Sequence, residues 1–269
     1  MSQITWDYHD SLQLLDLPHS PPITEANTPL HAVLDHLRPQ VLPQDKNNLT
    51  KMIKQDEVRQ AIRDLPNGKA SGLDGIPHEL WKLLMDRHDS KSPHSRPTFD
   101  ILTVLTAVYN NIERSGVTES TAFSEGWMCP LYKKNDRTEI SNYCPITVLN
   151  SDYKIFTRAL TNHLSTVTPY LIHPDQAGFM KGHRITDQTD LIRLMIHKCE
   201  ADKDNGTIIC LDQEKAYDKI AHPFLWAMLR KFGFPTHFID TMKSLYQYAH
   251  TKVIINGEVS TSFLILRGI

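Results

Sequence analysis

The sequence lacks the features that mark secreted, zinc-binding and membrane-spanning proteins. Its cysteines are few and none are spaced as C-x-x-C, so neither a disulfide framework nor a zinc site is expected. They read as the reduced thiols of an intracellular protein, nuclear or cytoplasmic. No apolar run approaches the ~20 residues that span a bilayer, and the opening "MSQITWDYHD" has no secretory pattern. The four cysteines are Cys129, Cys144, Cys199 and Cys210.

An excess of positive charge is also missing. The chain has 29 basic and 31 acidic residues among 269, which leaves a net charge of -2. Any contact with nucleic acid must therefore come from local Lys/Arg clusters and not from a global field. The 40% hydrophobic and 22% charged residues are ordinary globular values. The length suggests one large domain or two smaller ones.

The hydrophobic pattern predicts a helix-rich α+β protein. Residues 1–50 are punctuated by proline and read as a linker-like segment with one short helix near residues 28–37. Helical periodicity marks 56–65, 99–114, the long stretch after 150, 185–198, and two segments between 223 and 249. Short strands are expected at the start of "GWMCPLYKKNDR" (126–137), which ends in a basic turn, and in the segment that begins "NYCPITVLN". A buried strand is expected at "GTIICLD" (206–212). Asn256-Gly257 between two β-branched runs predicts a hairpin over 252–266.

One stretch, "IICLDQEKAYDKI" (208–220), points to chemistry. Asp212 ends the apolar run. A carboxylate at the end of a buried strand needs a partner that compensates for the cost of burying its charge. A divalent cation is one solution, because Mg²⁺ favours carboxylate and backbone oxygens and keeps substrate phosphates in its shell. The backbone carbonyl of Gln213 would lie beside such an ion. Tyr217, five positions after Asp212, could wall off the sugar of a bound nucleotide and exclude a 2′-hydroxyl.

Simpler interpretations exist for the same residues. Asp212 could be a solvated acid at a strand end, and Tyr217 a core aromatic. We interpret Asp218 as a helix cap or an ion-pair partner of Lys215 or Lys219. A haloacid-dehalogenase-like phosphotransferase also uses an aspartate after an apolar strand. The chemistry of that enzyme class requires a second aspartate two positions after the first, where this chain has Glu214.

Five ordered segments resemble the reverse transcriptase domain of non-LTR (LINE-like) retrotransposons. "LDQEKAYDKI" looks like the first catalytic motif of that family, and "NGKASGLDGIPHELWKLL" resembles its N-terminal extension. "CPLYKKNDRTEISNYCPITVLNSDYKIFTRAL" and "LIHPDQAGFMKGHRITDQ" resemble the fingers segments. The final "LILRGI" is similar to the segment before the motif that grips template and nucleotide. The likeness covers roughly residues 55–269.

The resemblance implies a right-hand polymerase architecture with fingers, a partial palm and a small antiparallel sheet. Residues 1–50 would be a linker, 51–204 the extension and fingers, and 205–269 a truncated palm. The implied activity is RNA-directed DNA polymerisation on an RNA template, with a DNA primer and deoxynucleoside triphosphates. Two Mg²⁺ ions would serve it, with Mn²⁺ as the alternative. Asp212 would be the catalytic and metal-binding residue, Gln213 a carbonyl ligand and Tyr217 the sugar gate. The residues implied for the triphosphate or template phosphates are Lys133, Lys134, Arg137 and Arg184.

Two departures from the family pattern lead us to expect that the isolated chain is inactive. Cys144 stands where the resemblance leads us to expect an arginine. A neutral thiol cannot replace a charged guanidinium group with its five N–H donors. Without that charged hydrogen bond, binding would weaken by ~1.5–3 kcal/mol. The sequence also contains no Asp-Asp dipeptide, which the family uses as its second carboxylate pair. A non-catalytic nucleic-acid-binding remnant of such an element is therefore the alternative hypothesis.

Overall fold

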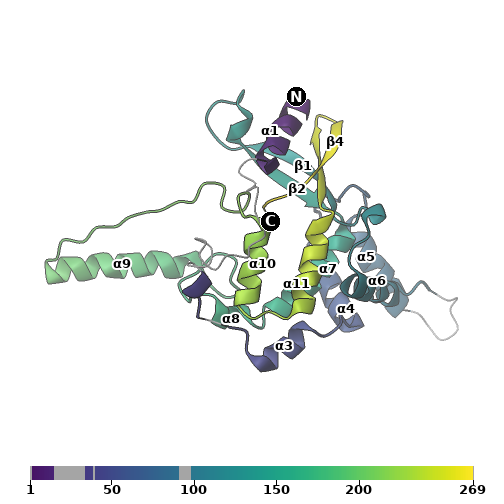
Figure 1. The fold of residues 1–269 in the computed structure, drawn as a ribbon, viewed down its shortest axis with the longest axis horizontal. Coiled ribbons are helices and arrows are strands. Elements are labelled where there is room, and N and C mark those ends of the chain that lie inside the picture. The colour runs from purple at the N-terminus through teal and green to yellow at the C-terminus, as the bar shows by residue number, and fades with distance from the viewer. Residues whose placement is uncertain (1, 15–33, 39, 91–97, 269) are drawn as a thin grey trace.

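The computed structural model describes residues 2–14, 34–38, 40–90 and 98–268. The fold is helix-rich with one small sheet, as the pattern predicted (Figure 1). The short helix expected near 28–37 lies largely outside the described residues. The α-helices are α1 (Ser2–Leu14), α3 (Pro43–Leu49), α4 (Gln55–Asp64), α5 (His78–Asp89), α6 (Ile101–Ser115), α7 (Ser151–Leu164), α8 (Thr168–Leu171), α9 (Ile185–Asp202), α10 (His222–Lys231) and α11 (Thr236–Gln247).

The sheet joins two pairs of strands that are far apart in the sequence. Its strands are β1 (Glu125–Tyr132), β2 (Tyr143–Leu149), β3 (His250–Ile255) and β4 (Glu258–Leu264), in the order β2-β1-β3-β4. The two hairpins are antiparallel, as expected, but β1 pairs with β3 in parallel. The sheet is therefore mixed, which local sequence could not indicate because that pairing spans more than 100 residues.

The hairpin turn between β3 and β4 follows from its two residues. Asn256 and Gly257 both adopt positive φ, 51° and 85°, which is the conformation that a two-residue hairpin turn requires. Both are residue types that tolerate this region of backbone space. The expected hairpin over 252–266 is confirmed, with β3 and β4 paired on either side of the turn.

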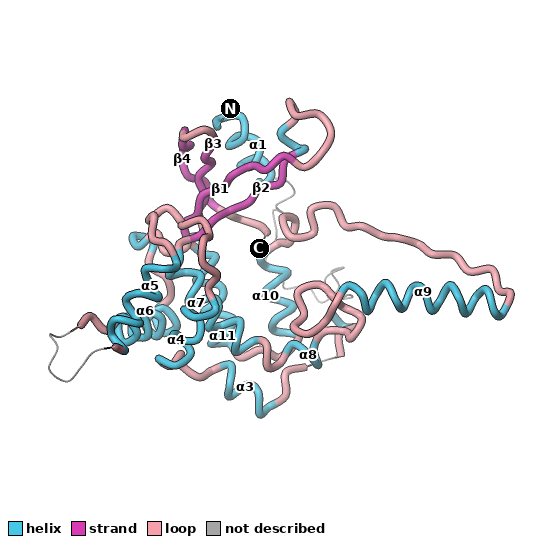
Figure 2. The backbone as a smooth tube through the Cα atoms, turned by 180° about the vertical axis from the view of Figure 1, so that it is seen from behind, coloured by secondary structure: helices cyan, strands magenta, loops and turns pink. Residues whose placement is uncertain are grey.

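Beneath the sheet lie two helical cores (Figures 1 and 2). The larger core joins α4, α6 and α7, with Phe156 and Tyr109 at its centre, both 0% exposed. The second joins α3, α8, α10 and α11 around Val167 and Phe238. Helix α1 lies instead against β3 and β4, where the Trp6 and Phe263 ring centroids are 6.2 Å apart. Within the segment expected to be linker-like, α1 and α3 are thus ordered helices that pack on later elements.

The buried strand predicted at 206–212 is absent from the structure, and that prediction was wrong. Residues 204–213 have no regular secondary structure and are exposed, with Ile209 76% and Leu211 92% accessible. An apolar run becomes a buried strand only if neighbouring strands cover its edges and faces, and no described strand pairs with it. Together with α9, the segment extends away from the rest of the molecule in both views (Figures 1 and 2).

A buried carboxyl group sits where α4, α6, α7 and α11 meet. Glu113 is 8% exposed, and its Oε2 has no hydrogen-bond partner among the described residues. Burial is the largest influence on the pKa of Glu113 and raises it, and the negative charge of Glu57 raises it further. The Ile53 N–H, His237 and His163 act in the opposite direction but do not cancel the effect of burial. His163 Nε2 lies 2.5 Å from Glu57 Oε1. The folded protein therefore holds a proton on Glu113 at pH values where the unfolded chain has lost it.

We expect Glu113→Gln to stabilise the protein at neutral and alkaline pH. Because the folded pKa of Glu113 is raised, stability falls as pH rises above the unfolded value of roughly 4.3. The neutral amide avoids that loss, so the gain should appear above this pH and vanish near pH 4. Urea unfolding across the pH range measures it, with exposed Glu119→Gln as the control. A gain of the same size at every pH would contradict the titration of Glu113.

Candidate active site

Asp212 lies in the exposed segment between α9 and α10, and not at the end of a buried strand as expected. Gln213 follows it, and residues 214–219 form turns. Within these turns Lys219 Nζ pairs with Glu214 Oε2 at 2.6 Å, and this pair lowers the pKa of Glu214. Glu214 is thus held by a lysine, while Asp212 faces solvent and is open to a ligand.

Tyr217 stands beside a second loop of the predicted fingers. Its ring is 49% exposed and meets Phe179 edge-on, with centroids 5.7 Å apart and an interplanar angle of 80°. Phe179 belongs to the "GFMKGHR" stretch that ends in Arg184 and has a left-handed φ of 60°. The structure therefore brings Tyr217 and this loop together, and Tyr217 is not a core aromatic. The sequence analysis did not identify Phe179 as a site residue. The only feature that could have indicated it is its position as a large aromatic residue directly after a glycine in a basic loop.

The N-terminal helix holds the loop that carries Tyr217. Lys215 Nζ donates to Tyr8 Oη at 2.8 Å and lies 5.1 Å from the Tyr8 ring centroid. At the other end of α1, Gln13 Oε1 accepts from the backbone N–H groups of Leu266 and Arg267, at 2.9 and 3.0 Å. No local pattern could predict these contacts, since more than 200 residues separate the partners.

Residues near the C-terminus contact the same loop. Gly268 N–H donates to the Ile220 carbonyl at 2.8 Å, and His222 Nε2 lies 3.0 Å from the Gly268 carbonyl oxygen. A Cβ on Gly268 would stand 3.2 Å from Asp218 Cα, and the residue has a φ of 85°. The close backbone approach and the positive φ both favour glycine here.

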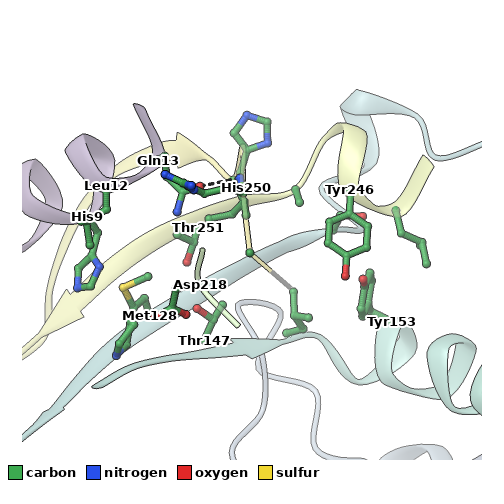
Figure 3. Close-up of a pocket in the computed structure, with 18 residues that line it drawn as sticks. His9, Leu12, Gln13, Met128, Thr147, Tyr153, Asp218, Tyr246, His250 and Thr251 are labelled. Atoms are coloured by element: carbon green, nitrogen blue, oxygen red, sulfur yellow. Dashed lines mark hydrogen bonds between the residues drawn. The ribbon is translucent and has the colours of Figure 1, made fainter. Parts of the chain in front are cut away.

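A cavity of about 320 Å³ lies between α1, the sheet and this loop (Figure 3). Asp218 lines it together with His9, Met128, Thr147 and Thr251. Burial, with the charge of Lys215 adding to it, lowers the pKa of His9 to about 4, so the ring is neutral at pH 7. The ion pair expected for Asp218 is not found. Of its expected partners, Lys219 pairs with Glu214 and Lys215 contacts Tyr8.

The predicted phosphate-binding residues fall into two groups. Lys133, Lys134 and Arg137 are exposed on the loop between β1 and β2, where the Arg137 guanidinium lies 4.5 Å from the Tyr132 ring centroid. Arg184 immediately precedes α9 and is exposed. The first group therefore belongs to the β1–β2 hairpin and the second to the start of α9, on separate elements of the fold. Cys144 sits half-buried in β2 opposite Leu131 and supplies no charge to either group.

The described residues do not make a complete metal site. Nowhere in 2–14, 34–38, 40–90 and 98–268 do three His, Cys, Asp or Glu side chains gather as they would to hold a metal ion. Asp212 is a single carboxylate, and a divalent cation of the Mg²⁺ type takes six oxygen ligands. The part of the chain that the structure describes also includes no helix long and apolar enough to cross a membrane.

Comparison with known proteins identifies the family. Residues 132–268 match the reverse transcriptase (RNA-dependent DNA polymerase) family, and the chain belongs to it. These residues include the segment of the predicted first catalytic motif (residues 211–220, the motif loop), the β3–β4 hairpin, α7 and α9–α11. Enzymes of this family are metal-dependent polymerases that act on RNA templates and nucleotides.

The related proteins come from mobile elements, which confirms the expected LINE-like retrotransposon origin. The chain is 31% identical over 231 residues to the transposon TX1 uncharacterized 149 kDa protein of Xenopus laevis, covering 86% of this chain and 17% of that protein. It is 26% identical over 226 residues to the probable RNA-directed DNA polymerase from transposon BS of Drosophila melanogaster, covering 81% and 23%. For the RNA-directed DNA polymerase from the Drosophila mobile element jockey, identity is 24% over 221 residues, covering 80% and 22%. The chain thus spans a quarter or less of each of these relatives.

Proposed function

We propose that this chain supplies the fingers and the first catalytic carboxylate of an RNA-directed DNA polymerase. The observation that carries the proposal is the exposed motif loop, in which Asp212 and Tyr217 lie five positions apart within a reverse transcriptase segment. Residues 51–204 form the extension and fingers in this proposal, and 205–269 the beginning of the palm. The substrates are an RNA template, a DNA primer and deoxynucleoside triphosphates. The free thiols favour an intracellular compartment.

Each site residue has a role in the proposal. Asp212 and the Gln213 carbonyl are two oxygen ligands suited to Mg²⁺, and the other ligands are not found among the described residues. Tyr217 limits the space beside the sugar, with Phe179 bracing its ring. In this proposal the triphosphate or template phosphates are bound by four exposed cations, Lys133, Lys134, Arg137 and Arg184.

Polymerisation is tested on the complete gene product that contains these residues. We expect template-dependent incorporation of deoxynucleotides only when RNA template, primer and added Mg²⁺ or Mn²⁺ are all present, and its loss when the metal is chelated. Absence of incorporation with either ion would contradict the polymerase proposal. The 269-residue polypeptide alone should not incorporate nucleotides, because one carboxylate cannot hold two metal ions. Activity of that polypeptide would show that its own residues complete the site.

A non-catalytic nucleic-acid-binding function is the second candidate. The absence of a complete metal-binding cluster among the described side chains favours it. It predicts salt-sensitive RNA binding that does not change when divalent metal is removed. The two functions are therefore separated by the metal dependence of incorporation, measured beside the metal dependence of binding.

A further inference from the structure

Helix α1 is anchored to the sheet by its own buried face. Thr5 is 3% exposed and His9 4% exposed, and the Trp6 ring packs edge-on with Phe263 of β4. The helix lies beside β3 and β4 in both views (Figures 1 and 2). An element anchored in this way can hold a loop that packs against it, although the sequence pattern predicted only a linker for this part of the chain.

From this anchored helix, Tyr8 reaches the middle of the motif loop. Lys215 Nζ donates to Tyr8 Oη at 2.8 Å, and the ammonium group also lies 5.1 Å from the centroid of the Tyr8 ring. Lys215 has a left-handed φ of 49°, a conformation that a non-glycine residue keeps only where surrounding contacts fix it. Asp212 lies three residues before Lys215, and Tyr217 lies two residues after it. The contact with Tyr8 therefore holds the point of the loop between the two proposed site residues.

A second set of hydrogen bonds leads from the other end of α1 to the end of the motif loop. Gln13 Oε1 accepts from the backbone N–H groups of Leu266 and Arg267. The next residue, Gly268, donates its N–H to the Ile220 carbonyl at 2.8 Å. Helix α1 thus holds the loop at its middle directly and at its end through these hydrogen bonds. Two fixed points leave little freedom to the backbone between them, and the proposed sugar gate stands on that backbone.

The other contact of the Tyr217 ring is weak by comparison. Phe179 meets it edge-on, but the Phe179 side chain is itself 92% exposed. Because few buried contacts fix an exposed ring, it cannot determine on its own where its partner lies. The position of the Tyr217 ring therefore depends on the backbone that carries it, and α1 fixes that backbone.

We propose that α1 is a positioning element of the polymerase site. Tyr8 acts through Lys215 to set the position of Tyr217, and thereby the discrimination between deoxyribonucleotides and ribonucleotides. The inference rests on the proposed function, because it takes Tyr217 as the group that excludes the 2′-hydroxyl. A side chain that works by steric exclusion has to be held within about 0.5 Å of its place by the residues behind it. Tyr8 itself touches neither nucleotide nor metal ion in this proposal.

Limited proteolysis of the 269-residue polypeptide tests the contact without requiring activity. Trypsin cleaves after lysine, and cleavage within a folded protein requires the local chain to open. Tyr8→Phe keeps the ring but removes the hydroxyl that Lys215 binds. We expect cleavage after Lys215 to become about fivefold faster, the factor that one hydrogen bond contributes on average, while cleavage after the exposed Lys203 keeps its rate. The matched control is Tyr170→Phe, because the Tyr170 hydroxyl donates to Asp45 and not to the motif loop.

The effect on the sugar gate is measured with the complete gene product. The readout is kcat/KM for incorporation of a deoxynucleotide divided by kcat/KM for the matching ribonucleotide. We expect Lys215→Met to lower this ratio about tenfold, because it removes a hydrogen bond made by a charged group, and to do so mainly by increasing ribonucleotide incorporation. Lys215→Arg should restore the ratio, since the guanidinium group keeps the charge and the N–H donors. A purely structural weakening of the loop would lower incorporation of both nucleotides together and leave the ratio unchanged.

A double-mutant cycle shows whether Tyr8 acts through Lys215. Tyr8→Phe should lower the ratio in the wild-type background but add nothing in the Lys215→Met background, and thermal unfolding confirms that each variant is folded. Independent effects of the two changes, an unchanged rate of cleavage in Tyr8→Phe, or an unchanged ratio in Lys215→Met would each overturn the inference. Absence of incorporation by the wild type would instead contradict the proposed function and the role of Tyr217, while the cleavage rates would still decide whether α1 holds the loop.

Discussion

Replacing Asp212 with asparagine is expected to lower template-directed incorporation by the complete gene product about a thousandfold. Asparagine keeps the size of the side chain but removes the negative charge that the proposal assigns to cation binding. Metal-ion stabilisation of transition-state charge is worth several kcal/mol, and about 4 kcal/mol corresponds to three orders of magnitude in rate. Primer extension under single-turnover conditions measures the decrease directly.

The matched control for Asp212→Asn is Asp204→Asn. Both aspartates are exposed in the same extended segment after α9, and both changes remove one charge. Only Asp212 lies in the motif loop, so only its variant should lose activity. Neither change should alter the midpoint of urea unfolding by much, because exposed side chains contribute little to stability. Equal activity of the two variants would remove Asp212 from the proposed site.

The parts of the fold that the sequence predicted are those that depend on neighbouring residues. The periodicity of 99–114 matches α6, and the Asn256-Gly257 turn places β3 beside β4. In each case, residues within a few positions carry the whole signal. The assignment of Asp212 and Tyr217 to one site also rests on their spacing alone, and it stays a prediction.

What the sequence could not predict depends on distant partners. The run 206–212 has the composition of a buried strand, but an apolar run cannot reveal whether another strand will cover it. The contacts of Tyr217 with Phe179 and of Lys215 with Tyr8 join loops far apart in the chain. Lys69, Lys154 and Arg158 likewise become neighbours only when α7 meets the loop after α4.

Helix α7 presents different side chains to the core and to the surface. Phe156 and Ile155 point into the larger core, while Lys154 and Arg158 line a surface groove beside the segment after α4. The Phe156 ring stacks on Tyr109 with centroids 5.0 Å apart, and it approaches Phe123 at 6.1 Å. Tyr109 is fixed in turn by its hydroxyl, which donates to the Asp152 carbonyl at 2.9 Å. The position of α7 therefore depends on this aromatic packing.

Phe156→Ala is accordingly expected to cause a large decrease in stability. Removing a fully buried phenyl ring costs about 3–5 kcal/mol, because the transfer energy of the ring and the cavity left behind add together. Domains of this kind are stable by only about 5–15 kcal/mol, so the variant should unfold at a much lower urea concentration. Phe99→Ala is the control, since its ring is 57% exposed, and it should change the free energy of unfolding by less than about 0.5 kcal/mol.

A milder change at the same position tests how much the volume of the ring contributes. Phe156→Leu keeps most of the apolar volume and should cost less than Phe156→Ala. Urea unfolding of both variants measures the difference in the free energy of unfolding. If instead Phe156→Ala costs no more than Phe99→Ala, the ring is not the centre of the core.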